Sequence, residues 1–370
     1  MSPAIDASVA LDQAPKGEGE IFKNVKVVEN AGGKTINVAR WIRSRALSFA
    51  PSSTRSLSRP EDSSSNRSRA LSFAPSSTRS LSRPEPASSA GSLPCPESRA
   101  LPRVICAGLL GEDNAALFEK EFAKYGIVDR MTRVKGATRR NEMITWPGGS
   151  FKLNQPAFAD VDFDEDRFLE QLVEKADVVI LSGSLPKCCS DDFYAKAVAA
   201  FKRQGAFVVL DASGEAMARA LRGAGLRPDL IKPNDEECEA LVGFKPKTAE
   251  EFKKATAMLK GEIATANGER LAGASRVIIS AGGAGAWFDG EFVAAPQVAV
   301  VDTTAAGDTL LAEYCWQLRG GGAPAFAVAA GSAACTMPGS NPPPVGLVEE
   351  LAEVAGNAES HFKCFIKHQK

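Results

Sequence analysis

The chain has 370 residues, 44% of them hydrophobic, and a formal net charge of −1. It can therefore bury one large core or two modest ones, and its charge gives no general bias towards nucleic acid or a membrane surface. The only histidines, His361 and His368, lie near the C-terminus, which excludes a histidine-based metal site or a Ser-His-Asp triad in the body of the chain.

Neither a secretory signal nor a membrane span is predicted. The N-terminus carries early acidic residues and no basic segment followed by an apolar run. The longest uncharged stretch, residues 320–348, is rich in Gly, Pro and Ala and indicates a buried helix with a loop. The eight cysteines include no C-x-x-C pair, which is typical of a reducing compartment. We expect a cytoplasmic protein.

The N-terminal part predicts extended, partly polar β segments at about residues 6–31 and 134–158, which we interpret as a β lid over a site. A helix expected over residues 35–43 precedes a strand at 103–110.

An insert separates that helix from that strand. Residues 43–102 are rich in Ser, Arg and Pro, and the 18-residue segment 44–61 recurs unchanged at 68–85. Such a composition offers little to bury, so we predict disorder. The insert fits either an arm that binds RNA or is phosphorylated, or a duplication without a role, and we favour the duplication.

From residue 164 onwards, strands and helices alternate. Apolar strands are predicted at 176–183, 205–213, 229–233 and 275–280, with amphipathic helices between them, and the Asp-Gly within WFDGEF predicts a hairpin. This order indicates a parallel sheet covered on both faces, with ligands at the carboxyl ends of its strands.

The segment DTTAAGD, residues 302–308, places a lone aspartate where a strand passes into a helix. The small residues Ala305, Ala306 and Gly307 leave backbone N–H groups bare at the positive end of the helix dipole, so they predict an anion hole. Asp308 beside an anion is costly unless it accepts a proton, and a hydroxyl that attacks a γ-phosphate supplies one. Taken alone, the segment also fits an ordinary helix start.

Other segments carry small or polar residues at strand ends. SAGGAGAWF, residues 280–288, fits close approach of a nucleotide or a plain turn. In KPNDEE, Asn234 and Glu237 share a helix face that could hold Mg²⁺ through water, and Asn234 alone predicts an N-cap. ENAGGKTINVAR, residues 29–40, and SGSLP, residues 182–186, fit polar sugar contacts or a turn and a loop.

Taken in order, the segments SPAID, GGKTINVA, SGSLP, LDASGEA, LIKPNDEE and DTTAAGD resemble the ribokinase-like (PfkB) carbohydrate kinases, in the branch of 1-phosphofructokinase and tagatose-6-phosphate kinase. The resemblance covers residues 3–43 and about 103–348. It implies an α/β fold, a ribokinase-like three-layer sandwich with a mostly parallel central sheet and a small β-sheet lid. The kinase domain would comprise residues 1–42 and 103–360, followed by a tail at 361–370.

The resemblance also implies residue roles. Asp308 matches the catalytic base, residues 305–307 its anion hole, and Glu237 an indirect ligand of Mg²⁺ through water. The nucleotide site would be formed by Asn234, Gly282, Gly285 and Thr303. The substrate site would be formed by Asp6, Gly32, Gly33, Lys34, Asn37, Arg139, Gly183 and Ser184, with Lys34 and Arg139 near the substrate's phosphate because an arginine fork matches phosphate oxygens.

The chain departs from the family pattern at several positions. Thr35 and Ala305 stand where the family has Gly, and Ala305 would cost about 1 kcal/mol or more in a left-handed conformation. Residues 187–189 replace a Pro-Gly turn, and Ala281 and Ala284 alter the nucleotide turn. Family members also carry an apolar strand just ahead of SPAID, which we would expect in the central sheet.

The resemblance implies ATP- and Mg²⁺-dependent phosphorylation of a sugar phosphate. Fructose 1-phosphate is our first expectation, with tagatose 6-phosphate or fructose 6-phosphate as alternatives. A non-catalytic relative that binds nucleotide or sugar phosphate is an alternative of another class, and an RNA-binding role of the insert is a third. We expect no membrane or nucleic-acid partner, and the resemblance leaves a homodimer through the lid open.

Overall fold

The structure is a computed structural model that describes residues 3–10, 26–48, 101–147, 149–156, 158, 161–172, 176–222, 225–318 and 324–355. Most of the predicted insert, the tail at 361–370 and the middle of the first lid segment lie outside the described residues. None of the helices in the described ranges has the length and apolarity that crossing a bilayer requires.

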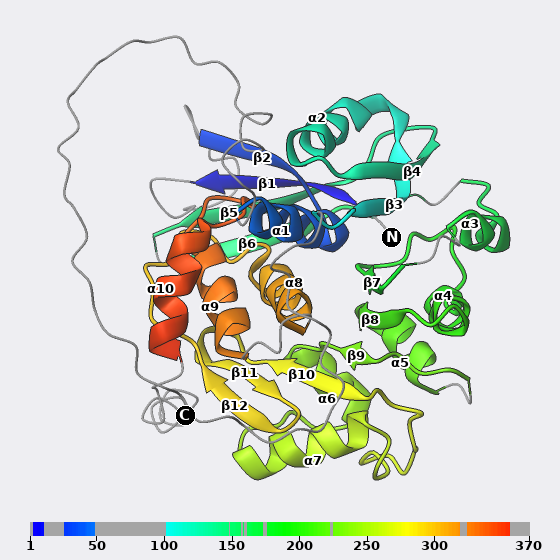
Figure 1. The fold of residues 1–370 in the computed structure, drawn as a ribbon, viewed down its shortest axis with the longest axis vertical. Coiled ribbons are helices and arrows are strands. Elements are labelled where there is room, and N and C mark those ends of the chain that lie inside the picture. The colour runs from blue at the N-terminus through cyan, green and yellow to red at the C-terminus, as the bar shows by residue number, and fades with distance from the viewer. Residues whose placement is uncertain are drawn as a thin grey trace, which may run out of the picture.

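A six-stranded sheet with the order β12-β11-β10-β9-β8-β7 forms the centre of the molecule (Figure 1). Four of its strands are parallel: β7 (Val178–Ser182), β8 (Phe207–Asp211), β9 (Leu230–Ile231) and β10 (Arg276–Ser280). The hairpin β11 (Gly285–Phe288) and β12 (Glu291–Ala294) continues the sheet in antiparallel orientation. The predicted α/β fold with a mostly parallel central sheet is confirmed.

The hairpin turn follows from the Asp-Gly pair. Asp289 has a φ of 51° and Gly290 a φ of 92°, so both central residues have the positive φ that a type I′ turn requires. Its backbone twist matches that of the flanking strands, which explains the tight connection.

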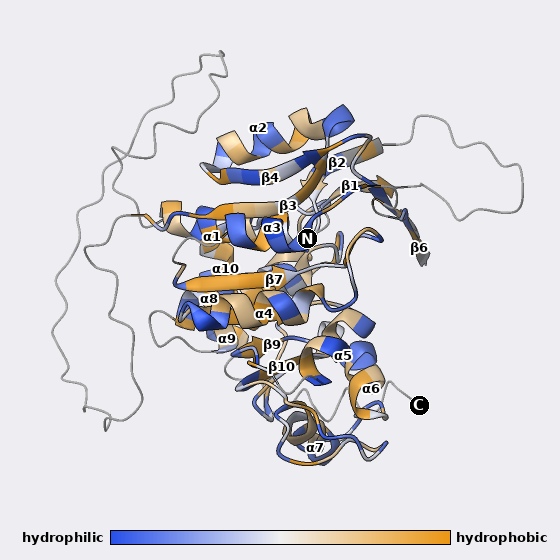
Figure 2. Ribbon diagram, turned by 90° about the vertical axis from the view of Figure 1, so that its right-hand side faces the viewer, coloured by the Kyte–Doolittle hydropathy of each residue, from blue (hydrophilic) through white to orange (hydrophobic). Residues whose placement is uncertain are grey.

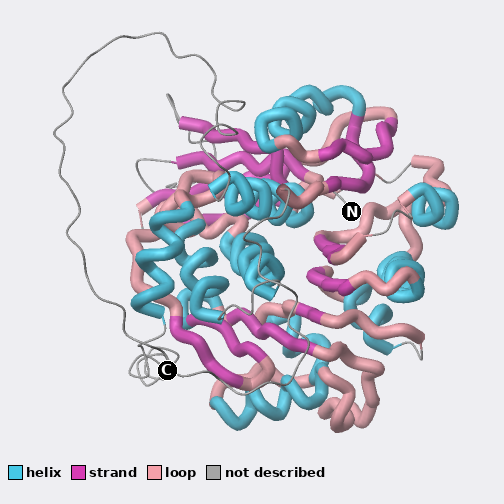
Figure 3. Tube along the Cα trace, viewed as in Figure 1, coloured by secondary structure: helices cyan, strands magenta, loops and turns pink. Residues whose placement is uncertain are grey.

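Helices cover both faces of the central sheet (Figures 1 and 3). Along β8, Val208 and Leu210 pack into one apolar cluster and Val209 into the other, because successive strand residues point to opposite faces. One face carries α4 (Phe193–Arg203), α5 (Glu215–Arg222), α6 (Asp235–Val242) and α7 (Ala249–Leu259), with α3 (Glu165–Gln171) beside α4. The other carries α1 (Lys34–Ser48), α8 (Ala306–Leu318), α9 (Pro324–Ala334) and α10 (Val345–Ala355).

The expected small β sheet has four strands in the order β2-β1-β5-β6. Its strands are β1 (Ala4–Ala10), β2 (Lys26–Gly32), β5 (Arg140–Trp146) and β6 (Gly149–Asn154). Strand β1 pairs with β2 antiparallel and with β5 parallel, so two segments more than a hundred residues apart form one sheet.

The strand expected at residues 103–110 is present as β3 (Ile105–Gly111), but it is not part of the central sheet. β3 pairs directly and in parallel with β4 (Val128–Val134). The short helix η2 (Glu112–Asn114) and helix α2 (Ala115–Tyr125) connect the two strands. Within the described residues, β3 and β4 form a separate two-stranded sheet.

Helix α1 runs through Ser48, whereas the sequence predicted its end at residue 43. The first residues of the duplicated segment are therefore helical. Arg45 is buried and lies 3.4 Å (Nε to Oε1) from the fully buried Glu313 of α8 and 2.8 Å (Nη1 to Oε1) from Glu349 of α10. The composition of the repeat predicted disorder, but these contacts with α8 and α10 hold its first residues, 44–48, in helix α1.

We expect Arg45→Ala to lower the free energy of unfolding by about 3 kcal/mol, because it leaves the Glu313 carboxylate buried without its cation. Urea unfolding followed by circular dichroism measures this. The matched control is Arg69→Ala in the second copy of the repeat, which should leave the stability unchanged. Equal losses from both variants would contradict a structural role specific to the first copy.

Candidate active site

Helices α1 and α8 begin side by side, and their first turns bring Asn37 and Asp308 together. The Asn37 side chain donates a hydrogen bond of 2.8 Å (Nδ2 to Oδ2) to Asp308. Both side chains are buried. Residues 271 positions apart therefore share one site at the positive ends of two helices.

The loop that leads into α8 is held in place by Asp302. Its carboxylate accepts hydrogen bonds from the Thr304 N–H (2.8 Å), the Gly339 N–H (3.1 Å) and the Ser8 hydroxyl of β1. Burial alone would raise the pKa of Asp302, but these donors hold it below its usual range. Asp302 thus connects the predicted anion hole to the small sheet.

The predicted anion hole contains a strained residue. Ala305 has a φ of 64°, the left-handed conformation that a Cβ disfavours by about 1–2 kcal/mol. Its carbonyl accepts from both the N–H and the hydroxyl of Thr309, which keeps it in place. The Ala306 N–H makes a long hydrogen bond of 3.4 Å to the Thr303 carbonyl. The next two N–H groups in the first turn of α8, those of Gly307 and Asp308, have no carbonyl of an earlier helical residue to pair with.

Two charged residues that the sequence analysis did not single out complete this region. Asp211 ends β8 and Lys232 follows β9, so both lie at carboxyl ends of adjacent parallel strands. Lys34 and Lys232 both pair with the same Asp211 oxygen, at 3.0 and 3.3 Å from Nζ to Oδ1. The signal that could have found Asp211 and Lys232 is their place at the ends of neighbouring strands.

Lys232 lies close to the predicted anion hole. A Cβ added at Gly307 would be 3.4 Å from the Lys232 Nζ, and the side chain is almost fully buried. The other Asp211 oxygen, Oδ2, is buried without a hydrogen-bond partner in the described part of the chain.

The charges in this cluster shift one another's protonation. Burial raises the pKa of Asp308, and Asp211 raises it further, while Lys34, Asn37 and Lys232 act in the opposite direction. Burial would lower the pKa of Lys34, but the carboxylates of Asp211, Asp308 and Glu237 raise it above its usual range. Lys34 therefore stays charged next to a carboxylate that binds a proton more readily than usual.

A second group of predicted residues lies where the small sheet meets this cluster. The Gly33 N–H donates to Asp6 Oδ2 at 3.1 Å, and a Cβ on Gly32 would lie 1.9 Å from the same oxygen. Only a glycine therefore fits at position 32. Arg139 donates to the Ser184 hydroxyl at 3.0 Å and acts electrostatically on Asp6.

A cavity of about 120 Å³ opens between the small sheet and the loop before α8. Asp6, Ser8 and Asn141 line it from β1 and β5, and Thr304 lines it from the loop. Asn141 was not predicted as a site residue, although it lies in the segment that contains Arg139. Gly183, with a φ of 92°, donates to the Asp211 carbonyl at 3.2 Å and so connects SGSLP to the charged cluster.

The predicted nucleotide residues lie on adjoining elements. Asn234 forms a bridge to Ser280 at the end of β10, and the Ser280 N–H donates to the Pro233 carbonyl at 3.0 Å. Gly282 has a φ of 54° and open space where a Cβ would be, while a Cβ on Gly285 would lie 2.1 Å from the Val293 carbonyl oxygen.

Asn234 and Glu237 form a complete capping box at the start of α6. The Glu237 N–H donates to Asn234 Oδ1 at 2.7 Å, and the Asn234 N–H donates to Glu237 Oε2 at 3.0 Å. The N-cap reading of Asn234 is confirmed. In the described residues, no group of three or more His, Cys, Asp or Glu side chains is arranged to hold a metal ion.

The carboxylates near the site nevertheless fit a hydrated Mg²⁺. Mg²⁺ keeps several waters and is commonly held by one or two carboxylates together with substrate phosphates. The unpartnered Asp211 Oδ2 and the Glu237 carboxylate, which acts electrostatically on Lys34, are the groups suited to that role.

A sequence model of the pfkB family of carbohydrate kinases matches residues 98–345. The chain belongs to this family. It is 33% identical over 222 residues to 1-phosphofructokinase of Vibrio cholerae and 37% identical over 217 residues to 1-phosphofructokinase of Rhodobacter capsulatus. These alignments cover 58% and 56% of this chain and 66% and 65% of the relatives, so the chain spans just under two thirds of their length.

Solved structures share the fold. Phosphofructokinase-2 of Escherichia coli, in complex with potassium, has a TM-score of 0.68 at 21% identity and covers 96% of this chain and 97% of its own. Ribokinase of Arabidopsis thaliana, complexed with ribose and ATP, has a TM-score of 0.61 at 20% identity and covers 95% and 96%. The predicted ribokinase-like fold is confirmed.

We expect Ala305→Gly to raise the free energy of unfolding by up to about 1 kcal/mol. The glycine relieves the left-handed strain, which outweighs the entropy it adds to the unfolded chain. Urea unfolding of the two proteins measures the difference, and Ala306→Gly, one residue further into helix α8, is the matched control that should lose stability. A loss of stability in Ala305→Gly as well would contradict the strain.

The stability of the fold should depend on the ionisation of Asp6. Burial, with a contribution from Asp308, raises the pKa of Asp6 to about 6. Because this folded-state pKa lies above the unfolded one, the protonated form stabilises the fold, and that contribution is lost as the pH rises through 6.

We therefore expect Asp6→Asn, which cannot ionise, to gain stability relative to the parent by up to about 3 kcal/mol between about pH 4 and about pH 7. Urea unfolding across this pH range measures the difference between the two proteins. A difference that stays constant with pH would show that Asp6 is not the group responsible.

Proposed function

We propose that this protein transfers the γ-phosphoryl group of ATP to a hydroxyl of a phosphohexose, with fructose 1-phosphate as substrate and fructose 1,6-bisphosphate as product. The observation that carries the proposal is the buried Asp308 in the first turn of α8, next to strained anion-hole backbone and two lysines. A proton acceptor beside donors for a transferring phosphoryl group is the arrangement that such chemistry needs.

In this proposal, Asp308 takes the proton of the attacking hydroxyl. Its Oδ2 is held by Asn37, so we assign the proton to Oδ1. The raised pKa of Asp308 makes it a stronger base than an exposed aspartate, and the nearby lysines keep it ionised before the reaction. The bond from the hydroxyl oxygen to phosphorus forms as the bond to the ADP oxygen breaks.

The negative charge of the transferring group meets the backbone N–H groups of Gly307 and Asp308 and the ammonium group of Lys232. Lys232 is preorganised, because Asp211 fixes its position and its surroundings exclude most water. Electrostatic stabilisation by such fixed donors is usually the largest single contribution to phosphoryl transfer and related reactions.

ATP would lie over the ends of β9 and β10, between the Gly282 turn and the start of α6, with Thr303 at its phosphates. Mg²⁺ brought in with ATP would be held through water by Glu237 and Asp211. When bound, it would neutralise phosphate charge.

The sugar would occupy the region around Asp6, Gly32, Gly33 and Asn37. Arg139 and Ser184 are bonded to one another at the edge of this region, and they would bind the phosphate that the substrate already carries. Lys34 pairs with Asp211, and the Gly183 N–H donates to the Asp211 carbonyl. Both residues would therefore lie between the substrate and the anion hole.

The relatives called 1-phosphofructokinase favour fructose 1-phosphate. Tagatose 6-phosphate and fructose 6-phosphate remain the alternative substrates, and a structure of phosphofructokinase-2 in complex with fructose-6-phosphate is among the similar folds.

The small sheet would act as a lid that excludes water from the transfer. In β6, Lys152 and Asn154 line the inner cavity, so Phe151 and Leu153 point to the opposite face, because strand side chains alternate. Both are exposed, as is Val27 of β2. Dimerisation through the lid remains a prediction, and this apolar outer face is where it would occur.

The test is an ADP-release assay with Mg-ATP against fructose 1-phosphate, tagatose 6-phosphate, fructose 6-phosphate, fructose and ribose. We expect the highest kcat/KM with fructose 1-phosphate, and Asp308→Asn should lower kcat by about 10²–10⁴, because it removes the base. Circular dichroism should show that the variant remains folded.

The same assay separates binding from chemistry. Lys232→Met should lower kcat more than it changes KM, because the ammonium acts on the transferring group. A well-folded parent protein that binds ATP but releases no ADP with any sugar would refute the kinase proposal and favour the non-catalytic relative, for which the strain at Ala305 is the supporting observation.

A further inference from the structure

Two adjacent cysteines, Cys188 and Cys189, lie in the turn that connects β7 to α4. They are the only neighbouring cysteines in the sequence, and both are free and half-buried. They belong to residues 187–189, where the chain departs from the family's Pro-Gly turn. No step of the proposed phosphoryl transfer uses them.

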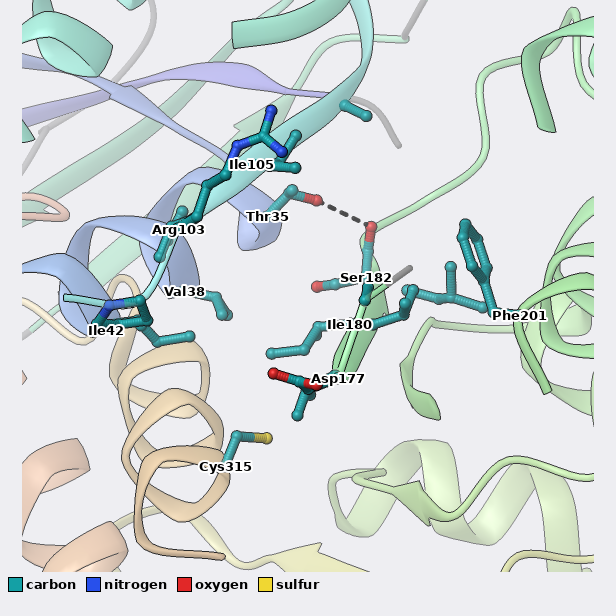
Figure 4. Close-up of a pocket in the computed structure, with 18 of the residues that line it drawn as sticks. Thr35, Val38, Ile42, Arg103, Ile105, Asp177, Ile180, Ser182, Phe201 and Cys315 are labelled. Carbon is teal, nitrogen blue, oxygen red and sulfur yellow. Dashed lines mark hydrogen bonds between the residues drawn. The ribbon is translucent and has the colours of Figure 1, made fainter. Parts of the chain in front are cut away.

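The chain that enters this turn is held from two sides. Strand β7, which leads into it, is hydrophobic along its length (Figure 2). The hydroxyl of Tyr194, a fully buried residue in the first turn of α4, donates to the Ser182 and Gly183 carbonyls at 3.0 and 2.7 Å. Figure 4 shows that the Thr35 hydroxyl of α1 also donates to the Ser182 carbonyl, at 3.4 Å. The start of the turn is therefore fixed relative to both α1 and α4.

The far end of the turn is held by Glu165, the first residue of α3. Its carboxylate accepts hydrogen bonds from the Ser190 N–H and from the Ser190 hydroxyl, the latter at 2.8 Å. Within the turn, the Cys189 N–H donates to the Pro186 carbonyl at 3.0 Å. The backbone of both cysteines is thus held in place, so a ligand that bridges their side chains has little backbone freedom to remove.

The two thiols lie together and carry their protons. Their side chains hydrogen-bond to each other, and Cys189 packs against the apolar cluster on the α4 face of the sheet. Burial raises the pKa of Cys189 to about 12 and the pKa of Cys188 above its usual range, and the Glu165 carboxylate raises both further. Because the thiolate is the nucleophile, reagents that attack one sulfur should react slowly here.

A disulfide within the pair is unfavourable for a geometric reason. The peptide bond between the two residues is trans, which holds neighbouring Cα atoms about 3.8 Å apart. Disulfides usually join Cα atoms that are about 4.4–6.8 Å apart. An atom that bonds to both sulfurs does not require the sulfurs to be in bonding contact, so the pair favours a ligand that bridges it through one central atom.

The surroundings of the pair restrict what that central atom can be. In the part of the chain that the structure describes, no third His, Cys, Asp or Glu joins a pair of such side chains to hold a metal ion. Metal ions in thiolate sites commonly take four protein ligands. The central atom must therefore be satisfied by two sulfurs and a substituent of its own.

We propose that Cys188 and Cys189 form a binding site for a trivalent arsenical that carries one organic group and two hydroxyl groups. Each sulfur forms a bond to arsenic, and each thiol proton leaves with one arsenic hydroxyl as water. Arsenic remains trivalent, so no oxidant or reductant is consumed. The second bond forms within one molecule, at a high effective concentration of the second thiol.

The test uses the full chain and phenylarsine oxide, whose hydrate is an arsenical of this kind. After incubation, the protein is unfolded, labelled with iodoacetamide and cleaved after Lys187 and Lys196. Residues 188–196, CCSDDFYAK, contain both cysteines and no other, so mass spectrometry of this peptide reports on the pair alone. We expect equimolar phenylarsine oxide to block both thiols together, with one arsenic bound per pair.

The matched controls remove one thiol at a time. Cys188→Ser and Cys189→Ser should each need about 10²-fold more phenylarsine oxide for half-maximal binding, because the bridging bond is lost. Cys335→Ser removes a different half-buried thiol and should leave binding at residues 188–196 unchanged. Circular dichroism checks that each variant is folded.

Two measurements need no variant. In the parent protein, 1,2-ethanedithiol should release the arsenical, whereas an equal concentration of 2-mercaptoethanol should not, because only a dithiol can replace both bonds. The isolated peptide CCSDDFYAK should need about tenfold more phenylarsine oxide than the folded chain, because it must order its backbone on binding. The proposal does not depend on the kinase activity, because its readouts are bound mass and thiol labelling.

Blocking of both thiols that only the dithiol reverses would support the proposal. Equal binding by the parent and the two single-thiol variants would overturn it, and so would binding that leaves residues 188–196 unblocked. A disulfide within residues 188–196 of the purified protein would also overturn it. Equally tight binding by the isolated peptide would show that the fold builds no site.

Discussion

The site depends on a cluster of opposite charges in which Asp211, Asp308 and Lys232 are buried and Lys34 is half-buried. Asp211 pairs with both Lys34 and Lys232. All three residues act electrostatically on the pKa of Asp308. Burial of any one charge alone would cost several kcal/mol, so each is tolerated only because the others are present. The cluster holds together the ends of β8 and β9 and the start of α1, and it places the Lys232 ammonium group and a carboxylate of raised pKa, Asp308, at the predicted anion hole.

A second constraint passes through the loop before α8. Asp302 binds this loop to β1 of the small sheet through Ser8 and to a distant loop through Gly339. A movement of the small sheet would therefore shift the backbone at Ala305, which is already strained by its left-handed conformation. Strained backbone of this kind commonly lies at sites where a ligand must be approached closely. The hydrogen bonds of Asp302 therefore link the position of the small sheet to the backbone of the predicted anion hole.

Most of the fold could be predicted from periodicity, because the apolar runs of β7, β8 and β10 and the amphipathic helices between them leave few alternatives. The site was partly predictable for a local reason: small residues, Asn234 and Asp308 stand where a strand passes into a helix. Lys232 and Asp211 were missed because a charged residue at a strand end is ordinarily solvent-exposed, and only the tertiary structure buries both, with Asp211 paired to Lys232 and to Lys34. Arg45 was missed because the repeat's composition concealed a helix end.

The sequence by itself determined the alternation of strands and helices, the Asp-Gly hairpin, the capping box at Asn234 and the family, since each depends on a few neighbouring residues or on ordered motifs. Only the tertiary structure decided that Asn37 holds Asp308 and that two lysines share one carboxylate. These features join residues far apart in the chain, and the free energy of burying a charge depends on neighbours that local sequence does not specify.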